Sequence, residues 1–214
     1  MKKYAAFSAI LLYVFTLPLS LKASNLLSQQ EQFNPTAVIS FVPQYFAVNG
    51  LRLDYDLSFN PNHWLQMAPV FFYRNSPSDG GLSYDRFNSQ KGAGLHIYHR
   101  YYPGEGFGKS TIYLGYGPVY HYNHLHYDQT TDNISYERYN SIHKTGLDGI
   151  IGFYTLLSDN MMVDFYFGMG FRYSFLSSDA DSPLKFNTTY SDFGYSGNIF
   201  VFGFRIGFIT GNSR

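Results

Sequence analysis

Residues 161–175, MMVDFYFGMGFRYSF, carry the pattern that most constrains the fold of this chain, a strict alternation of two kinds of side chain. Every odd-numbered position holds a large apolar or aromatic residue, whereas the even-numbered positions from Asp164 to Ser174 hold Asp, Tyr, Gly, Gly, Arg and Ser. A period of two places the two sets on opposite faces of a β-strand. The glycines and the β-forming residues disfavour a helix. The stretch therefore predicts a long strand with one apolar face and one polar face.

The same alternation recurs along the chain and predicts eight strands, with ten as the alternative. They are expected at about 36–48, 51–60, 64–74, 92–102, 110–122, 142–156, 161–175 and 195–208. Short turns follow the second, fourth and sixth strands, and long polar loops lie near 75–90, 123–141 and 176–192. The first hairpin, through Asn49-Gly50, departs from this rule because it is expected to be tight. Short turns at one end and long loops at the other are typical of an outer-membrane barrel.

The N-terminus and the composition agree with a secreted membrane barrel. Residues 1–23 combine Lys2 and Lys3 with an apolar core and a small residue, which predicts a cleaved signal peptide. The chain has 21 Tyr, 21 Phe and 20 Gly but only 14% charged residues, against about 25% in an ordinary domain. We expect a short periplasmic segment over 24–35, an outer-membrane barrel over 36–209 and a tail over 210–214.

Charge and cysteine content exclude several classes of function. Removal of the signal peptide takes away three of the 15 basic residues and none of the 15 acidic ones, which leaves 12 basic against 15 acidic residues. This balance argues against nucleic-acid binding, which normally requires a basic excess. The chain has no cysteine, so it forms no disulfide, no zinc–thiolate site and no cysteine-linked lipid anchor.

In a membrane barrel the apolar face points to lipid and the polar face lines the lumen. An eight-stranded lumen has room for side chains only, so charges inside it must be paired. Four arginines and four aspartates fall on the polar face, a balance that predicts a structural charge network without an open pore. These residues are Arg52, Asp54, Asp56, Arg100, Asp148, Asp164, Arg172 and Arg205.

The loop between the fifth and sixth strands allows alternative functions. His124, His126 and His143 place a surface metal site within geometric reach, although no metal or cofactor site is predicted. A lipid A-modifying hydrolase would need a Ser-His-Glu arrangement, built from Ser141, His143 and Glu137, or from His124 or His126 with Ser135. No motif supports it, so no catalytic residue is predicted. A soluble periplasmic lipocalin-like barrel would require the opposite arrangement, with the apolar face inside.

Four stretches carry a resemblance to a known group of proteins. They are GLRLDYDLSFNPNHWLQMAPVFFY (50–73), GAGLHIYHRYYPGEG (92–106), YLGYGPVY (113–120) and GFRIGF (203–208). Through them the chain resembles the small outer-membrane β-barrel proteins of Gram-negative bacteria, in particular a family of unknown function with OmpA- or OmpX-like architecture. The resemblance implies an eight-stranded barrel without catalytic residues. Six residues follow Phe208, where such barrels often end on an aromatic residue, and this departure leaves the end of the last strand open.

We therefore expect an all-β, transmembrane, antiparallel up-and-down barrel with a structural or surface-interaction role. Its expected partners are outer-membrane lipid and the barrel-insertion machinery, with sugar or protein contacts through the loops near 75–90, 123–141 and 176–192.

Overall fold

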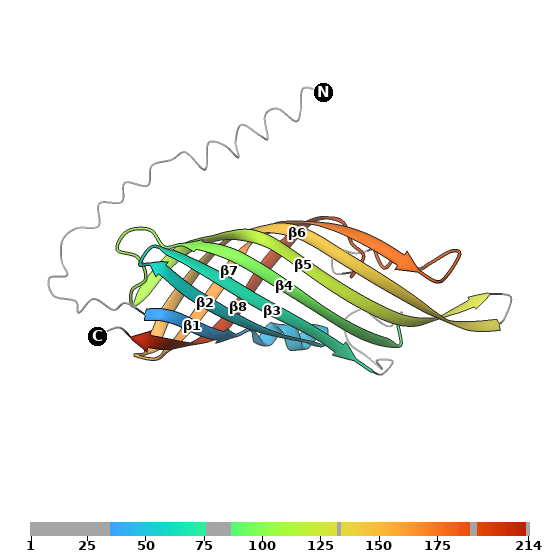
Figure 1. The fold of residues 1–214 in the computed structure, drawn as a ribbon, viewed down its shortest axis with the longest axis horizontal. Helices are drawn as coiled ribbons and strands as arrows, with labels where there is room; N and C mark the ends of the chain where they lie inside the picture. Colours follow the sequence, from blue (N-terminus) through green and yellow to red (C-terminus); the bar gives the residue numbers. More distant parts are fainter. Residues whose placement is uncertain (1–34, 76–86, 132–133, 189–191, 213–214) are drawn as a thin grey trace, which may run out of the picture. The chain divides into compact units, whose positions relative to one another are not determined.

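The computed structural model describes residues 35–75, 87–131, 134–188 and 192–212. The described residues form a closed antiparallel barrel in which each strand pairs with the next and the last pairs with the first (Figure 1). The strands are β1 (Pro35–Phe41), β2 (Gly50–Asn60), β3 (His63–Arg74), β4 (Ser89–Tyr101), β5 (Ser110–Thr131), β6 (Ile134–Ser158), β7 (Met161–Ser178) and β8 (Gly197–Asn212). The predicted eight-stranded barrel is confirmed. The predicted signal peptide, 1–23, lies outside the described residues.

The apolar face of each strand points outward. On β7 the side chains of Phe165, Phe167 and Phe171 are 53–64% exposed, whereas Asp164, on the opposite face of the same strand, is completely buried. A water-soluble barrel buries its apolar face instead, so this arrangement is that of a transmembrane barrel and not of a lipocalin-like one. None of the described helices is long and apolar enough to cross a membrane.

The first predicted strand is too long. β1 ends at Phe41, and a 3-10 helix, η1 (Pro43–Val48), follows it. Proline has no backbone N–H for a ladder hydrogen bond, and it is favoured at the first positions of a helix. The tight hairpin predicted at Asn49-Gly50 is also wrong, because Asn49 is the left-handed C-cap of η1, with φ of 55°.

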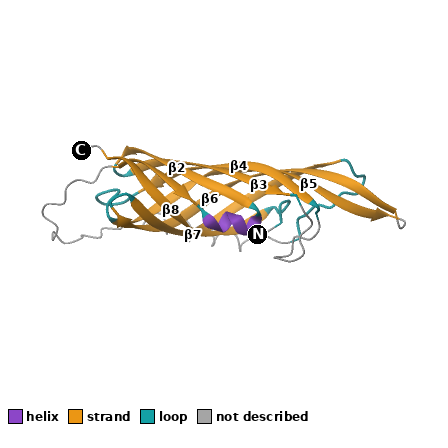
Figure 2. Ribbon diagram, turned by 90° about the horizontal axis from the view of Figure 1, so that it is seen from below, coloured by secondary structure: helices purple, strands orange, loops and turns teal. Residues whose placement is uncertain are grey.

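The predicted loop over 123–141 is wrong as well, because β5 and β6 remain paired as far as Thr131 and Ile134. β4 pairs with β5 only up to His126, and β7 pairs with β6 only up to Asn140. Residues 127–131 and 134–139 therefore extend past their neighbours as a two-stranded projection, the β5–β6 ribbon (Figures 1 and 2). Each face of this ribbon mixes polar and aromatic side chains, so the apolar alternation of the other strands is absent and the stretch resembles a loop.

β8 is longer than its partner β1. The two strands pair from Pro35↔Asn212 to Phe41↔Ile206, so β8 continues past Phe208 to Asn212. Towards its start, residues 197–205 pair with β7, and no strand of the described residues pairs with them on the opposite side. We call these residues the open edge. η1 lies beside it, since it contacts both β2 and β8.

Two apolar clusters lie at opposite ends of the lumen. At the end with short turns, the ring of Phe107 stacks on Trp64 and Tyr154, with centroid distances of 4.6 and 4.4 Å. At the end with long loops, Phe186 of the β7–β8 connection packs with Leu125 and other lumen-facing residues of β5 and β6. The lumen charges lie between these clusters.

Candidate functional site

Arg205 of β8 is the centre of the polar lumen. Its Nε donates to Asp164 Oδ2 at 2.6 Å, and its Nη1 donates to Asp56 Oδ2 at 2.7 Å and to Asp54 Oδ2 at 3.4 Å. Arg205, Asp164 and Asp54 are each 0–1% exposed. One guanidinium thus connects β8 to β7 and, through two carboxylates, to β2.

Arg100 of β4 reaches the same carboxylates from another wall of the barrel. Its Nη1 lies 3.3 Å from Asp164 Oδ2 and 3.7 Å from Asp56 Oδ2. Its Nε donates to Gln66 Oε1 at 2.9 Å, and its Nη2 donates to the hydroxyl of Tyr113 at 3.0 Å. The guanidinium also lies over the Tyr113 ring, 4.2 Å from its centroid. These contacts connect β4 to β2, β3, β5 and β7.

Arg52 and Arg172 each form a two-pronged pair with an aspartate. Arg52 donates to both carboxylate oxygens of Asp54, at 2.6 and 3.1 Å. Arg172 donates to both oxygens of Asp148, at 2.6 and 3.0 Å. Bidentate geometry of this kind gives the strongest arginine–carboxylate hydrogen bonds.

Hydrogen-bonded polar side chains connect the Arg172–Asp148 pair to the other lumen charges. Tyr98 donates to Asp148 Oδ2 at 2.5 Å, and His96 Nδ1 lies 2.8 Å from the Tyr98 hydroxyl and 3.5 Å from Arg52 Nη1. All eight charged residues predicted to line the lumen are thus brought together in one connected network. Their positive and negative charges balance, which offsets much of the cost of burying them.

Sequence reasoning missed several members of this site. Gln66 and Tyr113 lie on lumen-facing positions of predicted strands, but they carry no charge that would set them apart. Gln44 and Tyr45 fall within the first predicted strand, although both belong to η1. The ring of Tyr45 lies at the lumen, where its centroid is 5.4 Å from the Arg52 guanidinium. The alternation on the predicted strands could have identified Gln66 and Tyr113. Nothing in the sequence pattern indicates Gln44 and Tyr45.

A polar cavity of about 230 Å³ lies beside the network, next to the open edge. Its polar lining includes Arg52, Arg172, Lys144 and Asp148, and residues 199–202 of β8 form one wall. Lys144 Nζ donates to the backbone oxygen of Asp192 at 2.7 Å. Asp148 already accepts hydrogen bonds on both oxygens. The cavity therefore offers a ligand more hydrogen-bond donors than free carboxylate acceptors.

The residues considered for catalysis do not form the Ser-His-Glu arrangement that a hydrolase would need. His143 Nδ1 contacts the Tyr120 hydroxyl at 2.7 Å, and Glu137 lies 3.7 Å from His126. Ser141 contacts His124 instead, with 3.1 Å between Oγ and Nδ1. No carboxylate contact to His124 is seen among the described residues, so this serine–histidine pair lacks the third group that would orient the imidazole.

The histidines considered for metal binding lie on the outer face of the same hairpin. His124 and His126 both stack on the ring of Tyr139, with centroid distances of 5.6 and 4.8 Å. Within the described ranges, no group of three or more His, Cys, Asp or Glu side chains is arranged to hold a metal ion.

Comparisons with known proteins identify the fold of the chain but not its family. No family model and no curated protein matches the chain. The barrel is similar to a major outer membrane protein from Thermus thermophilus, with a TM-score of 0.51 and 13% identity over 81% of this chain and 98% of that chain. A weaker likeness, with a TM-score of 0.41 and 11% identity, links 85% of this chain to all of CarO from Acinetobacter baumannii. The resemblance to outer-membrane barrels is thereby confirmed for the fold.

Proposed function

We propose that this protein is a non-enzymatic, integral barrel of the outer membrane with a closed lumen, and that it presents a recognition surface outside the cell. The observation that carries the proposal is the combination of an outward apolar face with a balanced, fully buried network of eight charges. Selective channels line their pores with an excess of one charge, whereas a balanced network cross-links the wall.

Closure of the lumen is supported by three successive layers of side chains. The aromatic cluster around Phe107 lies nearest the short turns, the charge network follows, and the cluster around Phe186 lies nearest the long loops. An eight-stranded barrel leaves an interior that side chains fill. No solute path along the barrel axis is expected through these layers.

The proposed recognition surface is the β5–β6 ribbon together with the predicted loops near 75–90 and 176–192, of which residues 76–86 and 189–191 lie outside the described residues. If the short turns face the periplasm, the ribbon projects away from the cell. It exposes Ile134, Tyr136 and Tyr139, which are 42–55% accessible, and the imidazole of His126 stacks on Tyr139. Aromatic rings with a polar group are suited to contacts with sugars and with protein surfaces, and exposed segments on a rigid scaffold commonly carry binding functions.

The closed lumen is tested by single-channel recording in planar lipid bilayers. Protein folded in detergent, and verified by the mobility difference between boiled and unboiled samples, is expected to produce no stepwise conductance. A double variant, Tyr102→Ala with Tyr154→Ala, opens the aromatic layer and serves as a comparison for partial opening. Reproducible conductance steps from the folded wild type would refute the closed lumen.

The recognition surface is tested by shortening the ribbon. Replacement of residues 129–136 by Asn-Gly preserves a turn between the paired residues Asp128 and Glu137. The shortened protein is expected to fold but to lose binding to immobilised bacterial and host glycans and to cell surfaces. The matched control replaces Asp159-Asn160, an exposed turn at the other end, by Asn-Gly. Equal binding by the shortened and control proteins would remove the ribbon from the proposal.

A further inference from the structure

The open edge is a break in the barrel wall. Residues 197–205 of β8 have a hydrogen-bonded strand only on the β7 side, and in the described part of the chain no backbone hydrogen bond joins η1 to β8. Outward-facing Phe200 and Phe202 of this edge are 76–77% exposed, which places it in the apolar band. Backbone groups that face hydrocarbon without partners are costly. Side chains of η1, and not a strand, therefore cover this part of the wall.

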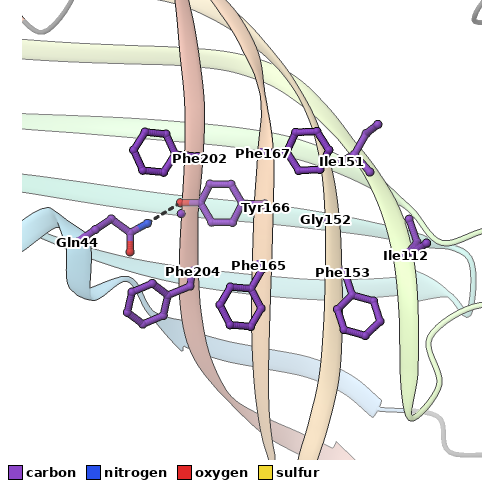
Figure 3. A pocket seen from close by; sticks show the side chains of 11 residues that line it. Gln44, Ile112, Ile151, Gly152, Phe153, Phe165, Tyr166, Phe167, Phe202 and Phe204 are labelled. Atoms are coloured by element: carbon purple, nitrogen blue, oxygen red, sulfur yellow. Dashed lines mark hydrogen bonds between the residues drawn. The ribbon is translucent and has the colours of Figure 1, made fainter.

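The side chains of η1 point to both faces of the barrel. Phe46 is 63% exposed and packs on Phe41 with 5.3 Å between the ring centroids. Gln44 points the other way, since its Nε2 donates to the lumen-facing hydroxyl of Tyr166 at 3.0 Å. One side-chain hydrogen bond thus runs from η1 past Gly203 of β8 to Tyr166 of β7 (Figure 3).

Two cavities meet at this hydrogen bond. An apolar cavity of about 540 Å³ lies on the outward face of the wall, where exposed aromatic and aliphatic side chains of β5 to β8 line it, including Phe165, Phe167 and Phe204 (Figure 3). The polar cavity of about 230 Å³ lies on the lumen side. Gln44, Tyr166 and Phe202 line both cavities. The outward apolar cavity and the lumen-side polar cavity therefore meet at the edge of β8, where the side chains of Gln44, Tyr166 and Phe202 lie between them.

Gly203 leaves the space in which Gln44 reaches Tyr166 between the two cavities. Its backbone lies on the strand between Phe202 and Phe204, and a Cβ atom at this position would collide with the amide nitrogen of Gln44 and lie 2.7 Å from the hydroxyl of Tyr166. Any larger residue would have to displace these two groups. The absence of a side chain at position 203 is thus a requirement of the contact between η1 and β8.

Along the barrel axis, packed side chains lie on both sides of the polar cavity. The charge network bounds it on one side, and on the other Phe72 contacts His121 and Phe193 with centroid distances of 5.6 and 6.3 Å. A ligand therefore reaches this cavity more directly through the break in the wall, from the membrane, than along the lumen.

The lining of the polar cavity selects the chemistry of the ligand. Lys144 lies outside the balanced set of four arginines and four aspartates, and its hydrogen bond goes to a carbonyl oxygen. The Asp192 carboxylate accepts hydrogen bonds from the Thr188 backbone N–H and hydroxyl. The ammonium group thus keeps donors for an anionic group, and the small volume favours a carboxylate over a bulky phosphate head group.

We propose that the open edge is a lateral binding site for a single-chain amphiphile with a carboxylate head, such as a long-chain fatty acid. The carboxylate enters the polar cavity and contacts Lys144, and the hydrocarbon chain lies in the apolar cavity along Phe165, Phe167 and Phe204. Binding requires rotation of the Gln44 and Tyr166 side chains and leaves the charge network in place. The site is compatible with a closed lumen because the ligand does not cross the barrel along its axis.

The test is native mass spectrometry of delipidated, folded protein in a neutral maltoside detergent, titrated with palmitate. We expect one saturable palmitate per barrel. Hexadecanol, which lacks the charge, is expected to bind at least about tenfold more weakly, since a charge-assisted hydrogen bond contributes about that factor or more. Phosphatidylglycerol is anionic, but it is expected to bind more weakly than palmitate because its larger head group and second chain do not fit the polar cavity of about 230 Å³.

Single substitutions test whether palmitate binds at Lys144 and beside Gly203. Lys144→Gln is expected to weaken palmitate binding about tenfold, whereas Lys91→Gln, at an exposed position on β4, leaves it unchanged. Gly203→Ala is expected to weaken it through the collision with Gln44, whereas Gly149→Ala, with open space around the position, does not. If Gly203→Ala fails to fold, Phe202→Ala tests the same boundary between the two cavities. Unsaturable binding, equal binding of hexadecanol, tighter binding of phosphatidylglycerol, or a Lys144→Gln variant that equals wild type would each overturn the proposal.

Discussion

Removal of the Asp164 carboxylate tests the charge network at its most connected point. This carboxylate accepts hydrogen bonds from Arg205 Nε at 2.6 Å, from Tyr113 at 2.9 Å and from Arg100 Nη1 at 3.3 Å. In Asp164→Ala the lumen keeps all four arginines but only three of the four aspartates. Arg205 retains Asp56 and Asp54, whereas Arg100 retains only a longer ion pair with Asp56, at 3.7 Å.

The expected loss follows from this imbalance. Breaking a buried ion pair by removal of one partner costs about 3–5 kcal/mol because the other charge stays buried. The remaining partners of Arg205 place the expected loss for Asp164→Ala near the lower value, about 3 kcal/mol. Asp164→Asn keeps the shape and an acceptor for Tyr113, so we expect a smaller loss, about 1–3 kcal/mol.

The measurement is equilibrium urea unfolding of protein folded in detergent or lipid, followed by tryptophan fluorescence. The chain contains a single tryptophan, and Trp64 is 1% exposed within the aromatic cluster, so its signal reports loss of lumen packing. Asp159→Ala removes an exposed acid and is expected to change the free energy of unfolding by less than about 0.5 kcal/mol. A loss in Asp164→Ala below about 1 kcal/mol, or one equal to that in Asp159→Ala, would refute the paired, buried network.

Two further predictions concern the faces of the wall and use the same unfolding measurement. Phe167→Arg places a charge on the outward face, where the native side chain is 64% exposed, and is expected to cost about 2–4 kcal/mol in a bilayer; a neutral result would mean that this face contacts water. In Gly170→Ala the new methyl group would collide with Asp148 Oδ1 and lie 2.7 Å from Arg172 Nη1, so we expect a loss of about 1–3 kcal/mol. Gly149→Ala meets open space and is expected to leave the midpoint unchanged, and an equal effect of both glycine substitutions would contradict the assigned packing.

The sequence predicted the faces of the strands better than their ends. Since side chains alternate with a strict period of two, the placement of Arg52, Asp54 and Asp56 on one face follows as soon as the strand is recognised. The pairing within the network does not follow, because it depends on which strands face one another across the lumen. Arg100, for example, meets Asp164 across 64 residues of sequence.

The two errors in strand length have different physical causes. At the β5–β6 ribbon the strands continue beyond their neighbours, where each face mixes polar and aromatic residues and the apolar alternation that reveals a membrane strand disappears. In the first predicted strand, a single proline determines where the strand ends, and the alternation does not show it. Pro43 provides a helix start that the apolar pattern of the surrounding residues does not reveal.

The position of Pro43 also explains why the wall is broken where it is. The register of β1 with β8, from Pro35↔Asn212 to Phe41↔Ile206, would place Val48 opposite Ile199 if the strand continued as predicted. A strand over 36–48 would therefore have paired nearly all of the open edge and sealed the polar cavity from the membrane. Pro43 would face Phe204 in that ladder and would lack its backbone donor. The same proline that ends β1 thus creates η1, leaves the β8 edge without a strand partner, and brings Gln44 to the opening at Gly203. The lateral site follows from where the first strand ends, and a barrel with a full-length first strand would not contain it.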